Sequence, residues 1–257
     1  MTFSTDRKLF DVTGKDRLTF LQGMLSNDVS VLAKGDGIVW AALLTPQGKY
    51  LADFFVVSLG ASLLIDIKDQ IAEATIRRLS MYRLRADIAF GLSTLTVRRG
   101  VDGAPIGAMS DPRHPALGWR AYQSADVAVP ETQTIDWDAI RVAHVIPETG
   151  IELIADDSYL LETGFERLHG VDFRKGCYVG QEVTARMKHK TELRKGLVQV
   201  RISGSAPVGT PILSQGKPAG TLFTQSQGKA IAYLRFDRTM DMIAGDAQIT
   251  MPQTDEA

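Results

Sequence analysis

The chain has 257 residues, of which 44% are hydrophobic and 23% are charged, and its formal net charge is −1. These values exclude a disordered chain and describe a globular protein with enough residues for one large domain or two to three small ones. A net charge so close to zero also argues against a protein whose whole surface binds nucleic acid.

The N-terminal part predicts helices that alternate with antiparallel strands. Asp16 can cap a helix whose apolar residues recur at spacings of three and four up to Leu25, and a second helix begins at Asp69. Apolar runs bounded by turn residues predict a meander of three strands between these helices, and two short strands after the second helix. The predicted strands are residues 38–44, 51–59, 63–67, 88–90 and 95–97.

The middle of the chain predicts an exposed connection followed by a strand and a helix. Glycine and proline recur from Gly100 to Pro115, which is typical of a loop around a short strand. Gly118–Gln123 then predicts a strand that pairs back. Trp137–Val145 predicts a helix with His144 on one side, where a half-buried, hydrogen-bonded histidine is the usual outcome.

The C-terminal part predicts a small β-barrel. From Leu197 onwards, short apolar runs are separated by glycines at intervals of 4 to 12 residues. The earlier part of the chain has wider spacing, so we place a domain boundary near residue 195. The predicted domains are a body of two interleaved subdomains, residues 1–194, and a barrel, residues 195–257.

The single cysteine of the chain lies in its most informative motif. Cys177 stands between two glycines and two residues after a lysine, in the run Lys175-Gly176-Cys177-Tyr178-Val179-Gly180-Gln181-Glu182. The thiolate is the reactive and metal-binding form of cysteine, and nearby positive charge favours it. Gly180 can cap a short helix over residues 181–186. From the residues alone, a functional thiol and a cysteine buried as a small hydrophobe stay equally open.

Cysteine content also bears on the compartment. One cysteine cannot form an internal disulfide, and secreted proteins of this size usually contain several. The first residues lack a sustained apolar run, and nowhere do 18 apolar residues follow one another. We therefore expect a cytoplasmic protein without a membrane association.

Basic residues are concentrated around the cysteine. Between Arg174 and Lys195, seven lysines and arginines face two glutamates, which gives this span a net charge of 7 − 2 = +5. Such a run can be a solvated face, or a site for an anion such as the glutamate tail of folate, an acidic protein or a tRNA phosphate.

The octapeptide resembles the signature of the YgfZ-like folate-binding family, relatives of the glycine-cleavage T-protein that include mitochondrial iron–sulfur assembly factors. Further similar segments are Gly14-Lys15-Asp16, Phe20-Leu21-Gln22-Gly23, Asn27-Asp28, Leu44-Thr45-Pro46-Gln47-Gly48-Lys49, Tyr82-Arg83-Leu84-Arg85, Arg141, Glu162 and Thr184-Ala185-Arg186. The chain departs from the family at Leu161, where proline is frequent, and at His144, near which glycine is expected.

The resemblance implies an α+β, T-protein-like folate-binding fold with antiparallel sheets and a small C-terminal β-barrel. It implies an accessory protein for iron–sulfur cluster assembly or repair, which supports enzymes including those that modify tRNA, with tetrahydrofolate as cofactor and Cys177 as the essential thiol. The partners would be iron–sulfur assembly or recipient proteins, and conventional catalytic turnover is not expected. A cluster needs about four ligands, mostly thiolates, so Cys177 could supply only one ligand of a shared cluster, and no metal site of the chain's own is expected.

Folate binding requires a carboxylate at the amino edge of the pterin, an aromatic or apolar wall for its ring, and cations for its glutamate tail. The candidates are Glu162 or Glu182 for the carboxylate, Tyr178 or Tyr82 for the ring, and Arg186, Lys175 or Lys188 for the tail, with Gln181 and Asp28 added by the family motifs. Glu182 could instead pair with Arg186 along a helix, Tyr178 could simply pack, and Asp28 could end the first helix.

Two other functions remain open. One is a tetrahydrofolate-dependent aminomethyltransferase, a one-carbon transfer enzyme, whose chemistry does not require a cysteine. The other is an RNA-binding accessory module that uses the basic span, for which aromatic residues are sparse.

Overall fold

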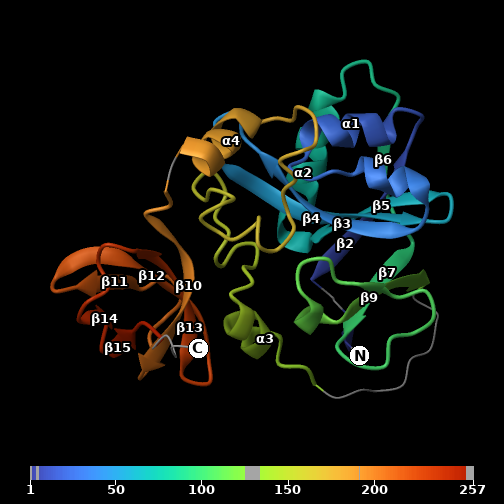
Figure 1. Cartoon of the computed structure of the whole chain (residues 1–257). Coiled ribbons are helices and arrows are strands. Elements are labelled where there is room, and N and C mark those ends of the chain that lie inside the picture. The colour runs from blue at the N-terminus through green and yellow to red at the C-terminus, as the bar shows by residue number, and fades with distance from the viewer. Residues whose placement is uncertain (1, 4–5, 125–133, 191, 253–257) are drawn as a thin grey trace. The chain divides into compact units, whose positions relative to one another are not determined.

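The computed structural model describes residues 2–3, 6–124, 134–190 and 192–252. The chain forms two compact units, each built from two stretches of sequence (Figure 1). Unit 1 comprises Met1–Ile135 and Glu166–Val183, and unit 2 comprises Asp136–Phe165 and Thr184–Ala257. The predicted division into domains at residues 194 and 195 stays a prediction. The compact units show that a stretch far upstream of this position groups with the barrel.

A five-stranded antiparallel sheet forms the centre of unit 1, in the order β3-β4-β5-β2-β6. Its strands are β2 (Arg7–Thr13), β3 (Gly37–Leu44), β4 (Tyr50–Leu59), β5 (Ser62–Lys68) and β6 (Ala89–Leu92). Three of them, β3, β4 and β5, form the predicted meander. Side chains alternate between the two faces of a strand, and one face of this sheet, including Phe54 and Ile65, packs against helices α1 and α2 in an apolar core.

Two helices of unit 1, α1 (Arg17–Met24) and α2 (Asp69–Tyr82), lie at the predicted positions. Two short 3-10 helices, η1 (Ser30–Lys34) and η2 (Pro115–Leu117), were not predicted. The predicted capping role of Asp16 is wrong, because its side chain makes no hydrogen bond to α1. Its carboxylate instead accepts a hydrogen bond from the backbone N–H of Asp87 at 2.8 Å, and so ties the start of α1 to the segment before β6.

A second, four-stranded sheet has the order β1-β7-β9-β8. Its strands are β1 (Thr2–Phe3), β7 (Leu95–Gly100), β8 (Met109–Ser110) and β9 (Trp119–Ser124). A buried charge network joins it to the central sheet. Asp66 of β5 accepts hydrogen bonds from Arg7 Nε at 2.7 Å, Arg120 Nη2 at 2.5 Å and the Tyr122 hydroxyl at 2.9 Å. The Arg120 guanidinium also lies 4.1 Å from the centroid of the Phe55 ring.

Unit 2 contains a closed barrel in the strand order β10-β13-β12-β11-β14-β15. Its strands are β10 (Lys195–Ser203), β11 (Pro211–Ser214), β12 (Lys217–Ser226), β13 (Lys229–Arg235), β14 (Met242–Ala244) and β15 (Ala247–Thr250). The barrel interior is apolar, with residues such as Leu222 and Leu234 fully buried. The predicted antiparallel sheets and the predicted C-terminal barrel are therefore confirmed.

Helix α3 (Trp137–His144) belongs to the same unit as the barrel. It begins as expected for a capped helix, because the Asp136 side chain accepts a hydrogen bond from the Ala139 N–H at 2.9 Å. The Gln199 side chain of β10 donates to the Val142 carbonyl at 2.8 Å, which attaches the helix to the barrel wall. Arg141, one of the family-like residues, is buried and pairs with Glu152.

Helix α4 (Gln181–Lys190) starts where the sequence predicts it and runs about one turn further than the predicted residues 181–186. The chain passes from unit 1 to unit 2 within this helix. Among the residues that the model describes, no helix combines the length and the apolar character needed to cross a membrane.

Candidate functional site

The residues from Arg174 to Gly180, which we name the thiol loop, connect the stretch 166–173 to helix α4. Cys177 is a free, exposed cysteine near the middle of this loop. A Cβ atom added to its neighbour Gly176 would meet no other heavy atom within 4 Å, so the space around this part of the loop is open. The structure therefore does not bury the cysteine as core filler.

The first anchor of the thiol loop is the Lys175 ammonium group, which is buried. Its Nζ donates hydrogen bonds to the backbone carbonyls of Gln22 at 2.7 Å, Leu25 at 2.5 Å and Asn27 at 2.9 Å, all at or just beyond the end of α1. A lysine ammonium has three donors, so these carbonyls use all of them. Lys175 thus fastens the loop to α1 and has no N–H left for a folate tail, which was one of its predicted roles.

Burial lowers the pKa of Lys175 to about 8, although the nearby Asp28 and Asp172 carboxylates act in the opposite direction. The ammonium also lies 5.0 Å from the centroid of the Tyr178 ring, a favourable cation–π arrangement. Tyr178 itself is buried. Tyr178 is therefore a packed residue whose ring stabilises the Lys175 ammonium group.

The second anchor is the contact between the end of the thiol loop and the tip of the β3–β4 hairpin. Gly180 has φ +81°, and a Cβ there would lie only 2.5 Å from the Thr45 carbonyl oxygen. Gly48 in the hairpin has φ +75°, and a Cβ there would lie 2.8 Å from the Val183 Cβ. A side chain at either glycine would be strained and would clash. The two anchors hold both sides of the loop, with the exposed Cys177 between them.

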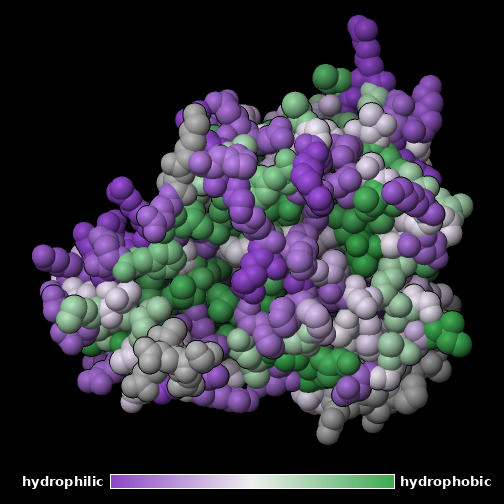
Figure 2. Space-filling model, in the orientation of Figure 1, coloured by the Kyte–Doolittle hydropathy of each residue, from purple (hydrophilic) through white to green (hydrophobic). Residues whose placement is uncertain are grey.

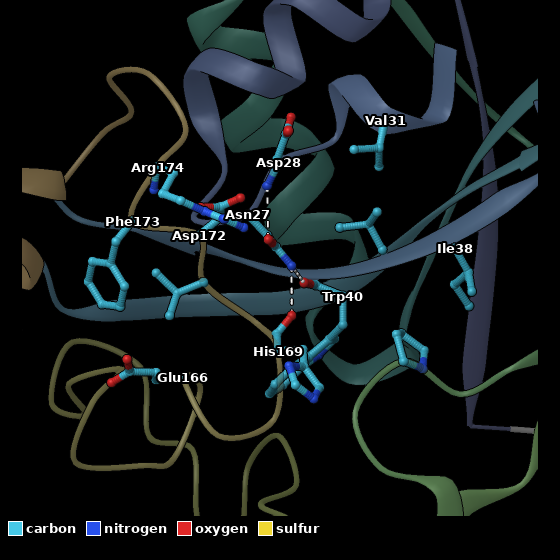
Figure 3. Close-up of a pocket in the computed structure, with 13 residues that line it drawn as sticks. Asn27, Asp28, Val31, Ile38, Trp40, Glu166, His169, Asp172, Phe173 and Arg174 are labelled. Carbon is cyan, nitrogen blue, oxygen red and sulfur yellow. Dashed lines mark hydrogen bonds and ion pairs between the residues drawn. The ribbon is translucent and has the colours of Figure 1, made fainter. Parts of the chain in front are cut away.

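A pocket of about 600 Å³ lies next to the thiol loop in unit 1 (Figure 3). Its lining residues are Asn27, Asp28, Val31, Ile38, Val39, Trp40, Pro112, Glu166, His169, Val171, Asp172, Phe173 and Arg174. The pocket and the loop share Arg174, and Cys177 is not among the lining residues. The wall thus combines apolar groups with carboxylates, an imidazole and a guanidinium.

Asn27 holds the two sides of this pocket together. Its side-chain amide donates to the Trp40 carbonyl at 2.8 Å and to the His169 carbonyl at 2.7 Å, and its oxygen accepts from the Asp28 N–H (Figure 3). The neighbouring Ser26 hydroxyl donates to the Gly170 carbonyl at 2.7 Å and is fully buried. These bonds fix the 166–174 stretch against the end of α1 and strand β3.

Asp28 is the one predicted cofactor residue that lines the pocket. Its Oδ1 accepts hydrogen bonds from the Ser30 N–H at 2.9 Å and hydroxyl at 2.6 Å, and from the Gln22 amide at 2.9 Å. The hydrogen bond from the Ser30 hydroxyl lowers the pKa of Asp28 more than any other interaction, and burial opposes this. The carboxylate is therefore ionised at neutral pH and helps to start η1.

Three predicted site residues belong to unit 2, namely Glu162, Arg186 and Lys188. Glu162 is buried and accepts a hydrogen bond from the Tyr233 hydroxyl at 2.5 Å, while the Lys195 ammonium lies 3.7 Å from the same carboxylate oxygen. Burial and this hydrogen bond raise the pKa of Tyr233. Glu162 thus joins the stretch before Glu166 to barrel strands β10 and β13. Arg186 is exposed on α4.

The remaining predicted residues belong to unit 1, and most of them lie on the thiol loop or in the first turn of α4. Gln181 and Glu182 form the first turn of α4, where Glu182 is exposed, and the Gln181 N–H donates to the Tyr178 carbonyl at 3.2 Å. Tyr82 is exposed at the end of α2, and Lys188 is exposed further along α4, in the part of the helix that belongs to unit 2. Unit 1 therefore contains Asp28, Lys175, Cys177, Tyr178, Gln181 and Glu182, which include the cysteine and its immediate neighbours.

Sequence reasoning missed most of the pocket wall. Glu166, His169, Asp172 and Phe173 carry no motif, and the hydrogen bond from Asn27 that places His169 spans 142 residues. The one available signal was the position of Asn27 next to Asp28. Among the described residues, no group of three or more histidines, cysteines and acidic residues could hold a metal ion.

Comparisons with known proteins identify the family. Residues 194–256 match the family model of the CAF17 C-terminal β-barrel domain. The chain is 30% identical to the mitochondrial iron–sulfur cluster assembly factor IBA57 homolog of Mycosarcoma maydis, over 78% of this chain and 57% of that protein. It is 29% identical to the mitochondrial iron–sulfur cluster assembly factor IBA57 of Mus musculus, over 89% of this chain and 75% of that protein. The chain belongs to the CAF17/IBA57-type family.

A solved structure supports the fold. The glycine cleavage system aminomethyltransferase T of Bartonella henselae matches with a TM-score of 0.72 and 12% identity, over 97% of this chain and 84% of that chain. At this identity, the match establishes the T-protein-like fold alone.

The relatives also correct one prediction and limit another. The expected cytoplasmic localisation is wrong, because the matched assembly factors are mitochondrial proteins. The chain spans only 54% to 64% of the length of the fungal relatives, so what those proteins do as a whole is carried over below as a proposal.

Proposed function

We propose that this chain assists the assembly or repair of iron–sulfur clusters and that Cys177 lends one thiolate to a cluster shared with a partner protein. The observation that carries the proposal is the exposed Cys177 on a loop fixed at both sides. The relatives named as iron–sulfur cluster assembly factors support it.

A shared cluster follows from ligand chemistry. Clusters are held mainly by cysteine thiolates, usually four. The chain has one cysteine, so a partner would have to supply the other ligands. The partners in this proposal are iron–sulfur assembly or recipient proteins, and the recipients include iron–sulfur enzymes that modify tRNA.

Tetrahydrofolate is the proposed cofactor, and the pocket of unit 1 suits it in chemical kind. The volume of about 600 Å³ lies within the range of small-molecule sites. Asp28 and Asp172 offer carboxylates for the amino edge of the pterin, Phe173 offers a ring, and Arg174 offers a guanidinium for the glutamate tail. Arg174 is 94% exposed, so it could reach a tail at the pocket mouth. When it is bound, tetrahydrofolate would act as a carrier of one-carbon units.

The thiol role is tested in cells that lack their own copy of this protein and receive either the wild-type chain or Cys177→Ser. The measured quantity is the activity of an iron–sulfur enzyme in these cells. We expect the variant to fail to restore the activity while its abundance and unfolding temperature match those of the wild type, because the side chain is exposed. Gly176→Ala, one residue away in open space, is the matched control and should restore activity. Full activity of Cys177→Ser would contradict the proposal.

Folate binding needs its own test. Tetrahydrofolate titrated into the purified chain should give a saturable change in tryptophan fluorescence, and Asp28→Asn should weaken it by about tenfold, as expected for a lost hydrogen bond to a charged group. The absence of saturation would remove folate from the proposal and leave the cluster role to stand on Cys177.

The T-protein-like fold favours one alternative, a tetrahydrofolate-dependent aminomethyltransferase. The two functions differ in their need for the thiol. The purified chain is therefore assayed for tetrahydrofolate-dependent aminomethyl transfer. Transfer that Cys177→Ser does not affect would favour the aminomethyltransferase over the assembly factor.

A further inference from the structure

The loop between helix α2 and strand β6 projects from unit 1 (Figure 1). It contains the Tyr82-Arg83-Leu84-Arg85 motif, to which neither the thiol loop nor the pocket assigns a role. Figure 2 shows hydrophobic groups among strongly hydrophilic ones on this projection. We define the projecting surface by Arg77, Arg78, Met81, Tyr82, Arg83, Leu84, Arg85 and Leu92, all of which are exposed.

Leu84 is the clearest sign that this surface has a use beyond folding. The residue is 89% exposed and its backbone has φ +44°. Leucine is disfavoured in this left-handed conformation, where glycine and asparagine are tolerated better. Neither the backbone geometry nor the core therefore explains a leucine at this position.

The arginines around Leu84 differ from the buried arginines of unit 1. Arg7, Arg113 and Arg120 are buried and paired with carboxylates. By contrast, the side chains of Arg77, Arg78 and Arg85 have no hydrogen bond or ion pair within the described part of the chain, and only Arg83 donates, to the Ile88 carbonyl at 3.3 Å. Residues 77–87 contain four arginines and a single acidic residue, Asp87, which gives a net charge of 4 − 1 = +3 in a chain of net charge −1.

Apolar groups extend the surface on both sides of the loop. Met81 is 66% exposed and Leu92 is 68% exposed. Leu92 ends β6, which is an edge strand of the central sheet, and a Cβ on the adjacent Gly91 would meet nothing within 4 Å. Within the described part of the chain, β6 pairs with β2 alone, so its other edge is not hydrogen-bonded to a strand.

We propose that the projecting surface docks an acidic protein whose contact area places carboxylates around an apolar recess that receives Leu84. Unpaired arginines select negative charge, and exposed leucine and methionine side chains select an apolar counterpart. RNA and anionic membranes also attract arginine, but three separated apolar side chains beside a strand edge fit a protein surface better than they fit phosphates. None of the residues of this surface belongs to the thiol loop or lines the pocket.

The test uses the full chain and a fluorescent synthetic peptide in which glutamate and aspartate alternate with leucine and valine. We expect saturable binding at moderate salt that weakens by about tenfold when Arg78 and Arg85 are both changed to glutamate. Arg201→Glu, at an exposed position of β10, is the matched control and should leave binding unchanged.

Leu84→Asn separates docking from folding. Asparagine tolerates the left-handed backbone, so the unfolding temperature should stay the same or rise, whereas binding of the peptide should weaken by about tenfold as expected for the loss of an apolar anchor. Equal binding by Leu84→Asn and the wild type would overturn the proposal, as would the absence of saturable peptide binding. Tighter binding of tRNA or of anionic vesicles, lost in the double arginine variant, would overturn it in favour of that ligand.

Discussion

Two polar clusters of unit 1 differ in whether they leave a reactive side chain exposed. In the network around Asp66, carboxylate, guanidinium and hydroxyl groups satisfy one another in a buried space between two sheets. In the thiol loop, Lys175 is equally committed to the carbonyls around the end of α1, but the cysteine two residues away is exposed. A polar side chain whose hydrogen bonds are all made within the protein holds the structure in place. The candidate site is the exposed group that such side chains position.

The largest expected effect comes from breaking the buried network. Asp66→Asn leaves Arg7 and Arg120 buried with one counter-charge fewer, so the free energy of unfolding in urea should fall by about 3–5 kcal/mol. Asp69→Asn, whose ion pair with Lys8 is largely exposed, is the control and should change it far less. A small effect of Asp66→Asn would show that the two sheets do not depend on this network.

Breaking the lysine anchor should cost less but should act on the loop. Lys175→Met removes the donor of three backbone carbonyls, and we expect a loss of about 1–3 kcal/mol in the free energy of unfolding. Amide hydrogen exchange of residues around 176–180 should accelerate, since the loop loses one anchor. Lys34→Met, at an exposed position, serves as the control, and unchanged exchange in Lys175→Met would contradict the anchoring role.

Two glycines of the thiol loop provide a matched pair. Gly180→Ala places a Cβ against the Thr45 carbonyl in a left-handed backbone, and should lower the free energy of unfolding by about 1–2 kcal/mol. Gly176→Ala adds the same methyl group in open space and should have almost no effect. Equal effects, measured by thermal unfolding, would show that the hairpin tip does not hold the loop.

The buried network should also give the stability a dependence on acid. Burial opposes ionisation of Asp66, but the charges of Arg120 and Arg7 outweigh it and bring its pKa from 3.8 to about 2. A lowered carboxylate pKa gives stability that is present above about pH 4 and is lost as the pH falls towards 2. The difference in free energy of unfolding between the wild type and Asp66→Asn should therefore shrink over this range. A constant difference would contradict the pairing.

Periodicity located most elements, because apolar alternation in β3 to β5 and the glycine spacing of the barrel reflect local backbone geometry. The motif around Cys177 likewise marked the thiol loop. The partners of that loop could not be predicted, since the Lys175 bond to the Leu25 carbonyl spans 150 residues and a carbonyl carries no side-chain signal. Lys175 therefore looked like a ligand group, although its structural role is an anchor. The pairing of Glu162 with Tyr233 spans 71 residues and was hidden for the same reason.

The most direct test is the rate at which a soluble disulfide reagent modifies Cys177 in the native chain, compared with the rate in urea. An exposed thiol on a loop held at both sides should react in the native state within about tenfold of the denatured rate, with no dependence on global unfolding. Modification that occurs only as fast as the whole protein unfolds would contradict the central claim that the fold presents this sulfur to a partner.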